Sequence, residues 1–165
     1  YFIHPLSDGV PKQSAELLAA ARDLIHEQVD WDSIDIILGI EAMGIPLATA
    51  LSLASGKPLV VGRKRTYGLP GELAIDQTTG YSKGEIYLND IGKGDRVLLV
   101  DDVVSTGGTL LPILKAIDEI QANVADCWII FEKGEGMDMI RSFGDWPLNS
   151  LVKIEMIDNK VSLIG

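Results

Sequence analysis

The chain has 165 residues, of which 47% are hydrophobic and 23% are charged, and its formal net charge is −10. This length fits one domain with a substantial core, and the acidic balance disfavours a nucleic-acid surface, which requires a basic footprint. A single cysteine, Cys127, excludes a disulfide framework and a cysteine-ligated zinc site, and two histidines suggest no metal cluster. Because no apolar run reaches the roughly eighteen residues of a membrane span and no signal peptide is visible, we expect a cytoplasmic protein with no membrane partner.

The first part of the chain predicts a strand, a helix and a second strand. Residues 1–4 are typical of a short strand, and turn material follows over 5–11. Apolar residues at helical spacing predict a helix over 13–29, with Ser14 as its cap. Consecutive apolar residues predict a buried strand over 34–40.

A loop containing glycine joins that strand to a helix expected over 45–54. The loop consists of Glu41, Ala42, Met43 and Gly44. A helix N-terminus carries unpaired N–H groups and the positive end of the helix dipole, so this junction is suited to bind an anion. A tight turn without a ligand is the alternative.

Three cations follow the next predicted strand, which spans 58–62. They are Arg63, Lys64 and Arg65. Such a run is usually a solvated patch. At a strand end in an acidic chain, it could instead stabilise the negative charge of a leaving group.

The run 97–110 has the most specific pattern. Four apolar residues, 97–100, predict a buried strand that Asp101 and Asp102 close, and Pro112 places the start of the next helix near Gly108. Between them lie Ser105, Thr106, Gly107, Gly108 and Thr109. Glycines let several N–H groups converge on a phosphate, while carboxylates suit sugar hydroxyls and hydrated Mg²⁺. One strand end could therefore hold a phosphorylated ribose.

This run, VLLVDDVVSTGGT, resembles the phosphoribosyl diphosphate (PRPP) signature of type I phosphoribosyltransferases. The resemblance implies that 105–109 bind the 5′-phosphate. It also implies that Asp101 and Asp102 are catalytic and hold Mg²⁺ through water and PRPP. A Rossmann-like strand with solvated aspartates and an ordinary glycine-rich turn is the alternative.

Two further segments resemble the adenine phosphoribosyltransferases. The loop 41–44 is similar to their diphosphate loop, Glu-Ala-Arg-Gly, with Met43 in place of arginine. If a cation is needed there, Arg63 or Lys64 must supply it. The segment 63–71 is similar to their RK-x-x-x-LPG run, with one residue more before LPG.

Residues 69–87 are polar, contain glycine and are weakly periodic, which is typical of a lid or a disordered segment. In the family this is the mobile catalytic loop that closes over PRPP. Tyr81, Ser82 and Lys83 begin a stretch similar to the Tyr-Gly-Lys-Ala-Glu that ends the loop, which assigns Lys83 to the diphosphate. Gly80 stands where adenine enzymes carry a glutamate, and this departure disfavours adenine.

A strand is expected over 123–131, followed by Glu132 and Lys133. A charged pair at a strand end is often a solvated edge. Ligands in open α/β sheets, however, collect at the carboxyl ends of strands. In 6-oxopurine phosphoribosyltransferases a lysine at this place donates to the exocyclic O6, so the resemblance assigns Lys133, together with Val103, to the base.

The expected fold is α/β, with a mostly parallel twisted sheet flanked by helices, in one domain over 1–165. Segments 151–157 and 161–164 predict a hairpin. The terminal segments, about 1–12 and 150–165, would form a small hood over the base.

The resemblance implies a purine salvage enzyme that converts PRPP and hypoxanthine or guanine into IMP or GMP and diphosphate, with Mg²⁺ as cofactor. Gly80 and Lys133 favour these bases, whereas the LPG run and the loop 41–44 favour adenine. A homodimer is expected by analogy. The signature is also compatible with an orotate or pyrimidine enzyme and with a PRPP-binding transcription regulator, although the lack of a recognisable DNA-binding domain disfavours the regulator.

Overall fold

The computed structural model describes residues 2–78 and 83–164. A six-stranded sheet has the order β2-β1-β5-β6-β7-β8, and β3 and β4 form a separate two-stranded sheet. The strands are β1 Ile36–Ile40, β2 Leu59–Gly62, β3 Leu73–Thr78, β4 Lys83–Leu88, β5 Arg96–Val104, β6 Asn123–Lys133, β7 Leu148–Ile157 and β8 Lys160–Ile164. The helices are α1 Pro5–Asp8, α2 Ala15–His26, α3 Gly44–Ser55, α4 Leu110–Glu119 and α5 Gly136–Arg141, with a 3₁₀ turn at Trp31–Ser33.

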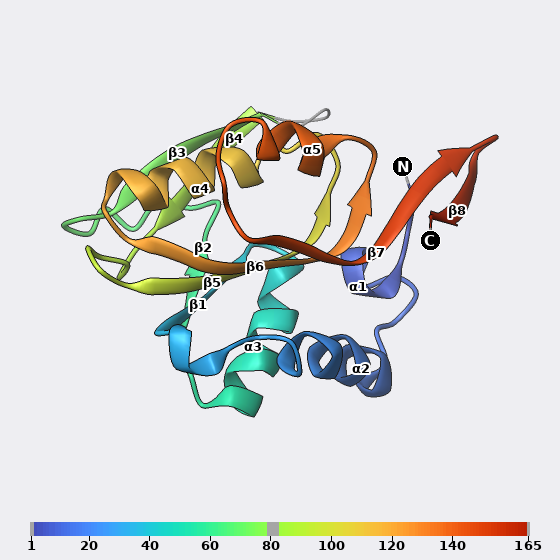
Figure 1. The fold of residues 1–165 in the computed structure, drawn as a ribbon, viewed down its shortest axis with the longest axis horizontal. Helices are drawn as coiled ribbons and strands as arrows, with labels where there is room; N and C mark the ends of the chain where they lie inside the picture. Colours follow the sequence, from blue (N-terminus) through green and yellow to red (C-terminus); the bar gives the residue numbers. More distant parts are fainter. Residues whose placement is uncertain (1, 79–82, 165) are drawn as a thin grey trace.

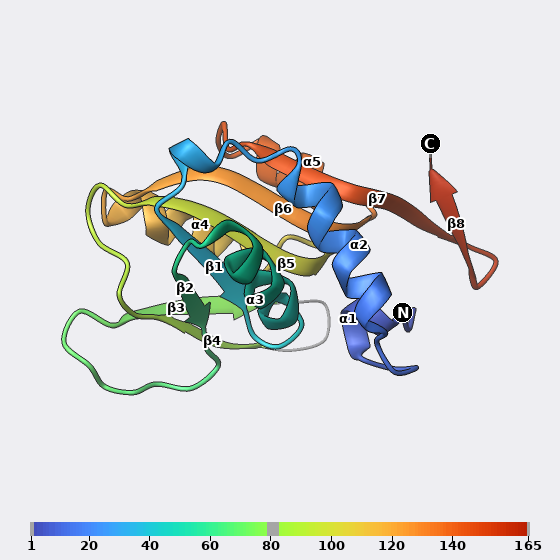
Figure 2. The ribbon, with the colours of Figure 1, turned by 90° about the horizontal axis from the view of Figure 1, so that it is seen from below.

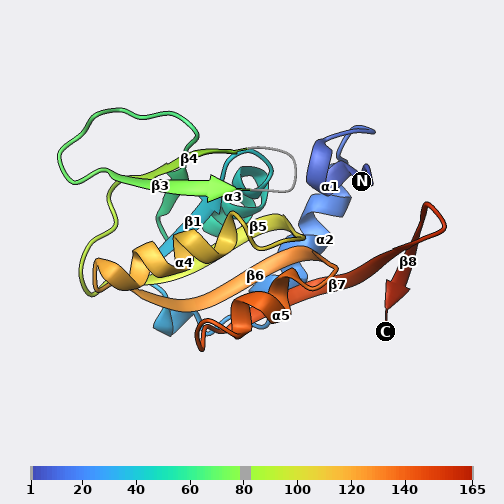
Figure 3. The same ribbon diagram turned by 90° about the horizontal axis from the view of Figure 1, so that it is seen from above.

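All pairs in the large sheet are parallel except β7 with β8. Helices α2 and α3 cover one face, while α4, α5 and the β3–β4 hairpin cover the other (Figure 1). Figure 2 shows the α2 and α3 side of the molecule, and Figure 3 shows the opposite side. The predicted α/β fold with a mostly parallel, helix-flanked sheet is therefore confirmed.

Strand β5 forms the centre of the core. Its residues 97–100 are completely buried. Side chains alternate along a strand, so Leu98 and Val100 join the apolar cluster under α2 and α3, while Val97 and Leu99 join the cluster under α4. Burial on both faces explains why this strand is a continuous apolar run.

The predicted strand at residues 1–4 is wrong, because residues 2–4 are irregular and the short helix α1 follows. His4 caps α1: its Nδ1 accepts a hydrogen bond of 3.2 Å from the N–H of Leu6. Pro5 suits the first helical position, where a missing N–H leaves no hydrogen bond unmade, and Gly9 ends the helix at φ +69°.

The prediction of 69–87 as a structureless segment is also wrong in part, because β3 and β4 form an antiparallel hairpin within it. Ile75 and Gln77 are buried while their neighbours along β3 are exposed or half-buried, which is the period-two pattern of a strand with one covered face. On β4, Ile86 and Leu88 are buried in the same cluster. This segment is therefore ordered into two strands because the hairpin packs against the core.

Several predicted boundaries shift at the carboxyl ends of the strands. Strand β5 continues through both aspartates to Val104, and β6 continues to Lys133. Helix α4 begins at Leu110, two residues after the expected start, with Pro112 in its first turn. The predicted C-terminal hairpin is present as β7–β8, and Asp158 and Asn159 at its turn have positive φ.

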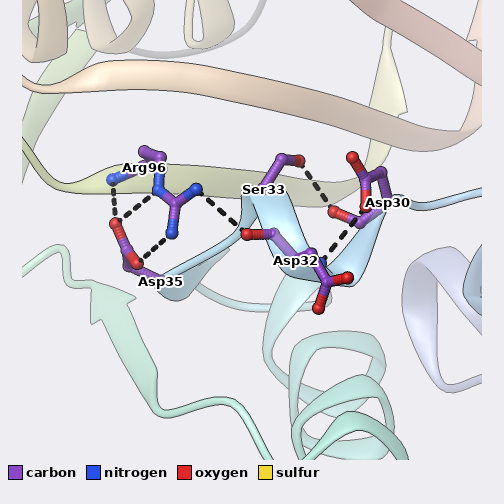
Figure 4. A network of polar contacts seen from close by, with 5 residues as sticks. All are labelled: Asp30, Asp32, Ser33, Asp35 and Arg96. Atoms are coloured by element: carbon purple, nitrogen blue, oxygen red, sulfur yellow. Dashed lines mark hydrogen bonds and ion pairs between the residues drawn. The ribbon is translucent and has the colours of Figure 1, made fainter.

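Arg96 stabilises the other end of the sheet, where β1 and β5 begin (Figure 4). Its guanidinium contacts both carboxylate oxygens of Asp35, at 3.0 Å from Nε and 2.8 Å from Nη2, and Nη1 donates to the carbonyl of Asp32. This network joins the start of β5 to the start of β1. The hydrogen bonds from Arg96 lower the pKa of Asp35 to about 2.

Both termini lie at one end of the molecule, where the β7–β8 hairpin extends away from the body (Figures 1 and 2). No helix within residues 2–78 and 83–164 is long and apolar enough to cross a membrane.

Candidate active site

Asp101 and Asp102 lie in β5 at the carboxyl end of the sheet, and both side chains are half-buried. The Oδ1 of Asp101 accepts a hydrogen bond of 2.9 Å from the backbone N–H of Asp102. Burial raises the pKa of both carboxyls, and the charge of Asp102 raises the pKa of Asp101 further, while Lys64 opposes that rise. Two such carboxylates are stabilised by a positive charge placed beside them.

The same pair offers oxygen ligands of the kind that Mg²⁺ prefers. In the described parts of the chain, no group of three or more His, Cys, Asp or Glu side chains could hold a metal ion. Asp101 and Asp102 would therefore hold Mg²⁺ only together with oxygens from water or a substrate.

The loop 105–109 joins β5 to α4 and lines a pocket. The pocket wall comprises Asp101, Val103, Val104, the five loop residues, Leu110 and Ile129. Gly107 has φ +77°, a conformation that favours glycine, and the hydroxyl of Thr106 accepts a hydrogen bond of 3.3 Å from the N–H of Gly108. The predicted phosphate loop thus lies next to the acids, at the N-terminus of α4.

The β3–β4 hairpin packs on this loop. The N–H of Thr78 donates to the carbonyl of Gly108 at 3.1 Å, and the hydroxyl of Thr109 donates to Oε1 of Gln77 at 2.8 Å. A Cβ on Gly108 would lie 1.6 Å from the carbonyl oxygen of Thr78, so no larger residue fits there. Gln77 was not among the predicted site residues, although it continues the period of two set by Leu73 and Ile75.

The loop 41–44 joins β1 to α3 and lies against the same acids. A Cβ on Gly44 would be 2.9 Å from the carbonyl oxygen of Val100 and 3.0 Å from Oδ1 of Asp101, so glycine permits this approach. The peptide bond between Glu41 and Ala42 is cis. The N-terminus of α3 and the carboxylates of β5 therefore share one site.

The carboxylate of Glu41 holds the cations that follow β2. Its Oε2 accepts hydrogen bonds of 2.9 Å from Nε of Arg63 and from the backbone N–H of Lys64. Arg63 also exchanges two backbone hydrogen bonds with Tyr87 of β4, at 3.0 and 2.7 Å. Glu41 therefore holds the Arg63 side chain and the Lys64 backbone beside the loop 41–44.

Two of the predicted loop residues, Tyr81 and Ser82, lie outside the described residues. Lys83 begins β4 and is exposed at the end of the hairpin, opposite Thr78. Its backbone is therefore connected through Thr78 to the phosphate loop.

At the end of β6, Lys133 is half-buried and pairs with Ile154 of β7, and Val103 pairs with Phe131. Glu132 is not a solvated edge residue, because its side chain is buried. It forms an ion pair of 2.9 Å with Nζ of Lys153 and accepts a hydrogen bond of 2.7 Å from the hydroxyl of Ser150. These two partners, which the sequence analysis missed, fix β6 to β7 beside Lys133.

The N-terminal segment also reaches this end of the sheet. The rings of Phe2 and His4 lie edge-on to Phe131, at centroid distances of 5.3 and 4.8 Å. Burial lowers the pKa of His4, although Asp8 opposes that effect. No pattern in the sequence links these two residues to Phe131, since the contact spans most of the chain.

Known proteins resemble this chain along nearly its whole length. The family model for the phosphoribosyl transferase domain matches residues 12–156. The chain is 51% identical over 164 residues to the hypoxanthine/guanine phosphoribosyltransferase of Ferroglobus placidus, covering 99% of this chain and 87% of that protein. It is 48% identical over 164 residues to the protein of the same name from Methanotorris igneus, covering 99% and 90% of the two chains.

Solved structures resemble its fold. The adenine phosphoribosyltransferase of Rhodothermus marinus aligns with a TM-score of 0.71 at 26% identity, covering 85% of this chain and 81% of that chain. That of Thermoanaerobacter pseudethanolicus aligns with a TM-score of 0.73 at 21% identity, covering 85% and 82%. With two strand-to-helix junctions and two carboxylates meeting at one end of the sheet, and with a family match over most of its length, this chain belongs to the phosphoribosyl transferase family and is a phosphoribosyltransferase.

Proposed function

We propose that the chain is a purine salvage phosphoribosyltransferase that converts PRPP and hypoxanthine or guanine into IMP or GMP and diphosphate. One observation carries this proposal: the acid pair Asp101 and Asp102 lies where two loops meet. The loop 41–44 leads into the N-terminus of α3, and the loop 105–109 leads into the N-terminus of α4. A phosphorylated sugar with a diphosphate at its other end requires two anion sites with acids between them.

Each part of the site has a separate task in this reaction. The N–H groups of 105–109 bind the 5′-phosphate, and the loop 41–44, Arg63, Lys64 and Lys83 bind the diphosphate. As the bond from C1 to the diphosphate breaks, positive charge develops on the ribose, and Asp101 and Asp102 stabilise it. Fixing both reactants in line makes the step effectively unimolecular, so no nucleophilic side chain is required.

Magnesium fits the same residues. When bound, Mg²⁺ supplies positive charge to the diphosphate leaving group. Asp101 and Asp102 would hold it through water and PRPP oxygens, because no group of three or more His, Cys, Asp or Glu side chains in the described parts of the chain could hold a metal ion.

The choice of base rests on the relatives and on Lys133. Proteins 46–51% identical to this chain are named hypoxanthine/guanine phosphoribosyltransferases. Lys133 at the carboxyl end of β6 would donate to O6 of a 6-oxopurine, with Val103 beside the base. The N-terminal segment and the β7–β8 hairpin would form the hood, since Phe2 and His4 already lie over Phe131.

Adenine is the second candidate. The solved structures of similar fold include adenine phosphoribosyltransferases, and the LPG run at 69–71 is typical of those enzymes. The exocyclic group of adenine is an amine, which would meet the ammonium of Lys133 with two donors facing each other. This conflict favours the 6-oxopurines.

The deciding experiment is a diphosphate-release assay with Mg²⁺ and PRPP, run in parallel with hypoxanthine, guanine, adenine, xanthine and orotate. Turnover of hypoxanthine and guanine supports the proposal, and turnover of adenine alone supports the second candidate. PRPP binding without turnover of any base would indicate the ligand-sensing regulator. Lys133→Met should reduce kcat/KM for hypoxanthine about tenfold while the KM for PRPP stays unchanged.

We further propose a homodimer in the cytoplasm. Analogy with the family supports the dimer, and the free, fully buried thiol of Cys127 suits a reducing compartment. Sedimentation equilibrium at micromolar concentration tests the dimer, because a monomer mass would contradict it.

A further inference from the structure

Gln77 is one of two polar or charged side chains that are buried within residues 2–78 and 83–164, and the other is the paired Glu132. It is 7% exposed and lies in β3. Its Oε1 accepts the 2.8 Å hydrogen bond from the hydroxyl of Thr109. A buried amide therefore contacts the last residue of the phosphate loop.

The backbone keeps these two side chains together. The hydrogen bond from Thr78 to Gly108 joins the residues that follow Gln77 and precede Thr109. A Cβ on Gly108 would overlap the carbonyl of Thr78, so the two segments are in direct contact. Gln77 thus reaches Thr109 through a fixed backbone junction.

The hydroxyl of Thr109 has one hydrogen and cannot donate it to two acceptors. The oxygens of a phosphate dianion only accept hydrogen bonds, so a phosphate that contacts this hydroxyl requires its hydrogen to turn from Gln77 toward the ligand. The lone pairs of Oγ1 then face the amide. A primary amide can respond by turning about its last torsion, which brings its NH₂ group to Oγ1.

The strand opposite leaves room for this rotation. Gln77 is paired with Gly84 of β4, and a Cβ on that glycine would lie 3.6 Å from Nε2. The amide therefore faces a residue without a side chain. A hydroxyl that accepts a hydrogen bond is also polarised and becomes a stronger donor.

We infer that Gln77 is a positioning residue for the 5′-phosphate: with phosphate bound, its Nε2 donates to Oγ1 of Thr109, and the Thr109 hydroxyl donates to the phosphate. This inference rests on the proposed function, because it takes 105–109 as the 5′-phosphate loop. Gln77 itself does not touch the substrate.

Gln77→Met tests this role, because methionine has a similar length and cannot hydrogen-bond to the hydroxyl. Ribose 5-phosphate is titrated calorimetrically, since it carries the 5′-phosphate without the diphosphate. We expect its affinity to fall, and the KM for PRPP to rise, on the order of tenfold. The affinity for free diphosphate and kcat should stay within about twofold of wild type. Gln28→Met, the same change at an exposed position, is the control and should alter nothing.

A double-mutant cycle separates positioning from simple support of the hairpin. In a Thr109→Val background, Gln77→Met should cause no further loss of ribose 5-phosphate affinity, because its effect passes through the hydroxyl. An equal loss in both backgrounds would overturn the inference. Thr109→Ser keeps the hydroxyl and should restore sensitivity to Gln77→Met.

Gln77→Glu serves if the methionine variant does not fold. Its carboxylate still accepts the hydrogen bond that Thr109 donates in the ligand-free chain, but it cannot donate one to the Thr109 hydroxyl. The affinity for ribose 5-phosphate should therefore fall at least as much as in the Gln77→Met variant. Wild-type affinity in this variant would refute the role of Gln77. Failure of the wild-type chain to bind ribose 5-phosphate or to release diphosphate would refute the proposed function instead.

Discussion

In the proposed reaction, the roles of Asp101 and Asp102 in catalysis and in stability conflict. Burial raises the pKa of both carboxyls, so ionising them is unfavourable in the folded chain. A carboxyl with a raised pKa contributes most to stability below its ordinary pKa, near 3.8, and that contribution is lost as the pH rises through the folded value. The ligand-free enzyme is therefore less stable at neutral pH than uncharged side chains would make it.

Asp101→Asn should separate the two properties. We expect kcat to fall at least about a hundredfold with a smaller change in PRPP affinity, because the carboxylate acts on charge that develops in the transition state. The free energy of unfolding at pH 7 should rise by on the order of 1 kcal/mol, and this gain should vanish near pH 4. Urea denaturation at both pH values measures the gain, and a variant less stable than wild type at pH 7 would contradict the argument.

Arg63 and Arg65 provide a matched pair of neighbouring cations. Arg63 is held by Glu41 beside the loop 41–44, whereas Arg65 lies over the ring of exposed Tyr67, at 5.6 Å from its centroid. Arg63→Met should raise the KM for PRPP and weaken binding of free diphosphate about tenfold, since a charge-assisted contact is lost. Arg65→Met is the control and should change neither. Equal effects would show that only the total charge of the run matters.

At the level of elements, the β3–β4 hairpin connects the two regions that we propose bind anions. Its β3 strand is hydrogen-bonded to Gly108 in the loop 105–109, and its β4 strand is hydrogen-bonded to Arg63 beside the loop 41–44. The packing of Ile75, Ile86 and Leu88 in the core fixes the hairpin on the sheet. An element outside the main sheet therefore sets the spacing between two loops of that sheet.

Gly108→Ala tests the contact between the hairpin and the phosphate loop. The added Cβ would overlap the Thr78 carbonyl, so the hairpin must move away. We expect the free energy of unfolding to fall by about 2 kcal/mol and the KM for PRPP to rise at least about tenfold. Gly92→Ala, in the connection between β4 and β5, is the control, because its Cβ would meet only Asp95, at an ordinary 3.9 Å. A stable Gly108→Ala variant with normal kinetics would show that the loop and hairpin are not rigidly joined.

At the scale of the whole molecule, structural support and chemistry lie at opposite ends of the sheet. The carboxyl ends of β1, β2, β5 and β6 carry the candidate active site, as expected for an open α/β sheet. The network of Arg96 with Asp35 and Asp32 holds the other end (Figure 4). Changes at that end should alter stability without changing the reaction.

Arg96→Met tests this separation. We expect a lower melting temperature and unchanged kcat and KM. The pKa of Asp35 is lowered to about 2. The contact therefore stabilises the folded chain above pH 3.8, the ordinary pKa of an aspartate, and this stabilisation is lost as the pH falls toward 2. The difference in melting temperature between wild type and variant should therefore narrow between about pH 4 and pH 2. A difference that stays constant over this range would contradict the assigned ion pair.

The central strand, the two acids at its end and both loops proposed to bind anions could be predicted from the sequence, because each is formed by contiguous residues. The run 97–110 predicts its own local structure: its apolar residues form a buried strand, and its glycines and the following helix start form the predicted phosphate loop. The hairpin at the C-terminus was equally local, since turn residues define it.

The contacts between these local units could not be predicted from the sequence and are visible only in the folded chain. Gln77 meets Thr109 across 32 positions, Glu41 meets Arg63 across 22, and Phe2 reaches Phe131 across most of the chain. Such contacts arise from packing the hairpin, the N-terminal segment and β6 against a shared core, and periodicity within a segment carries no information about its distant partners. Short segments of the sequence therefore supply the side chains of the candidate site, whereas the fold determines how those side chains are positioned.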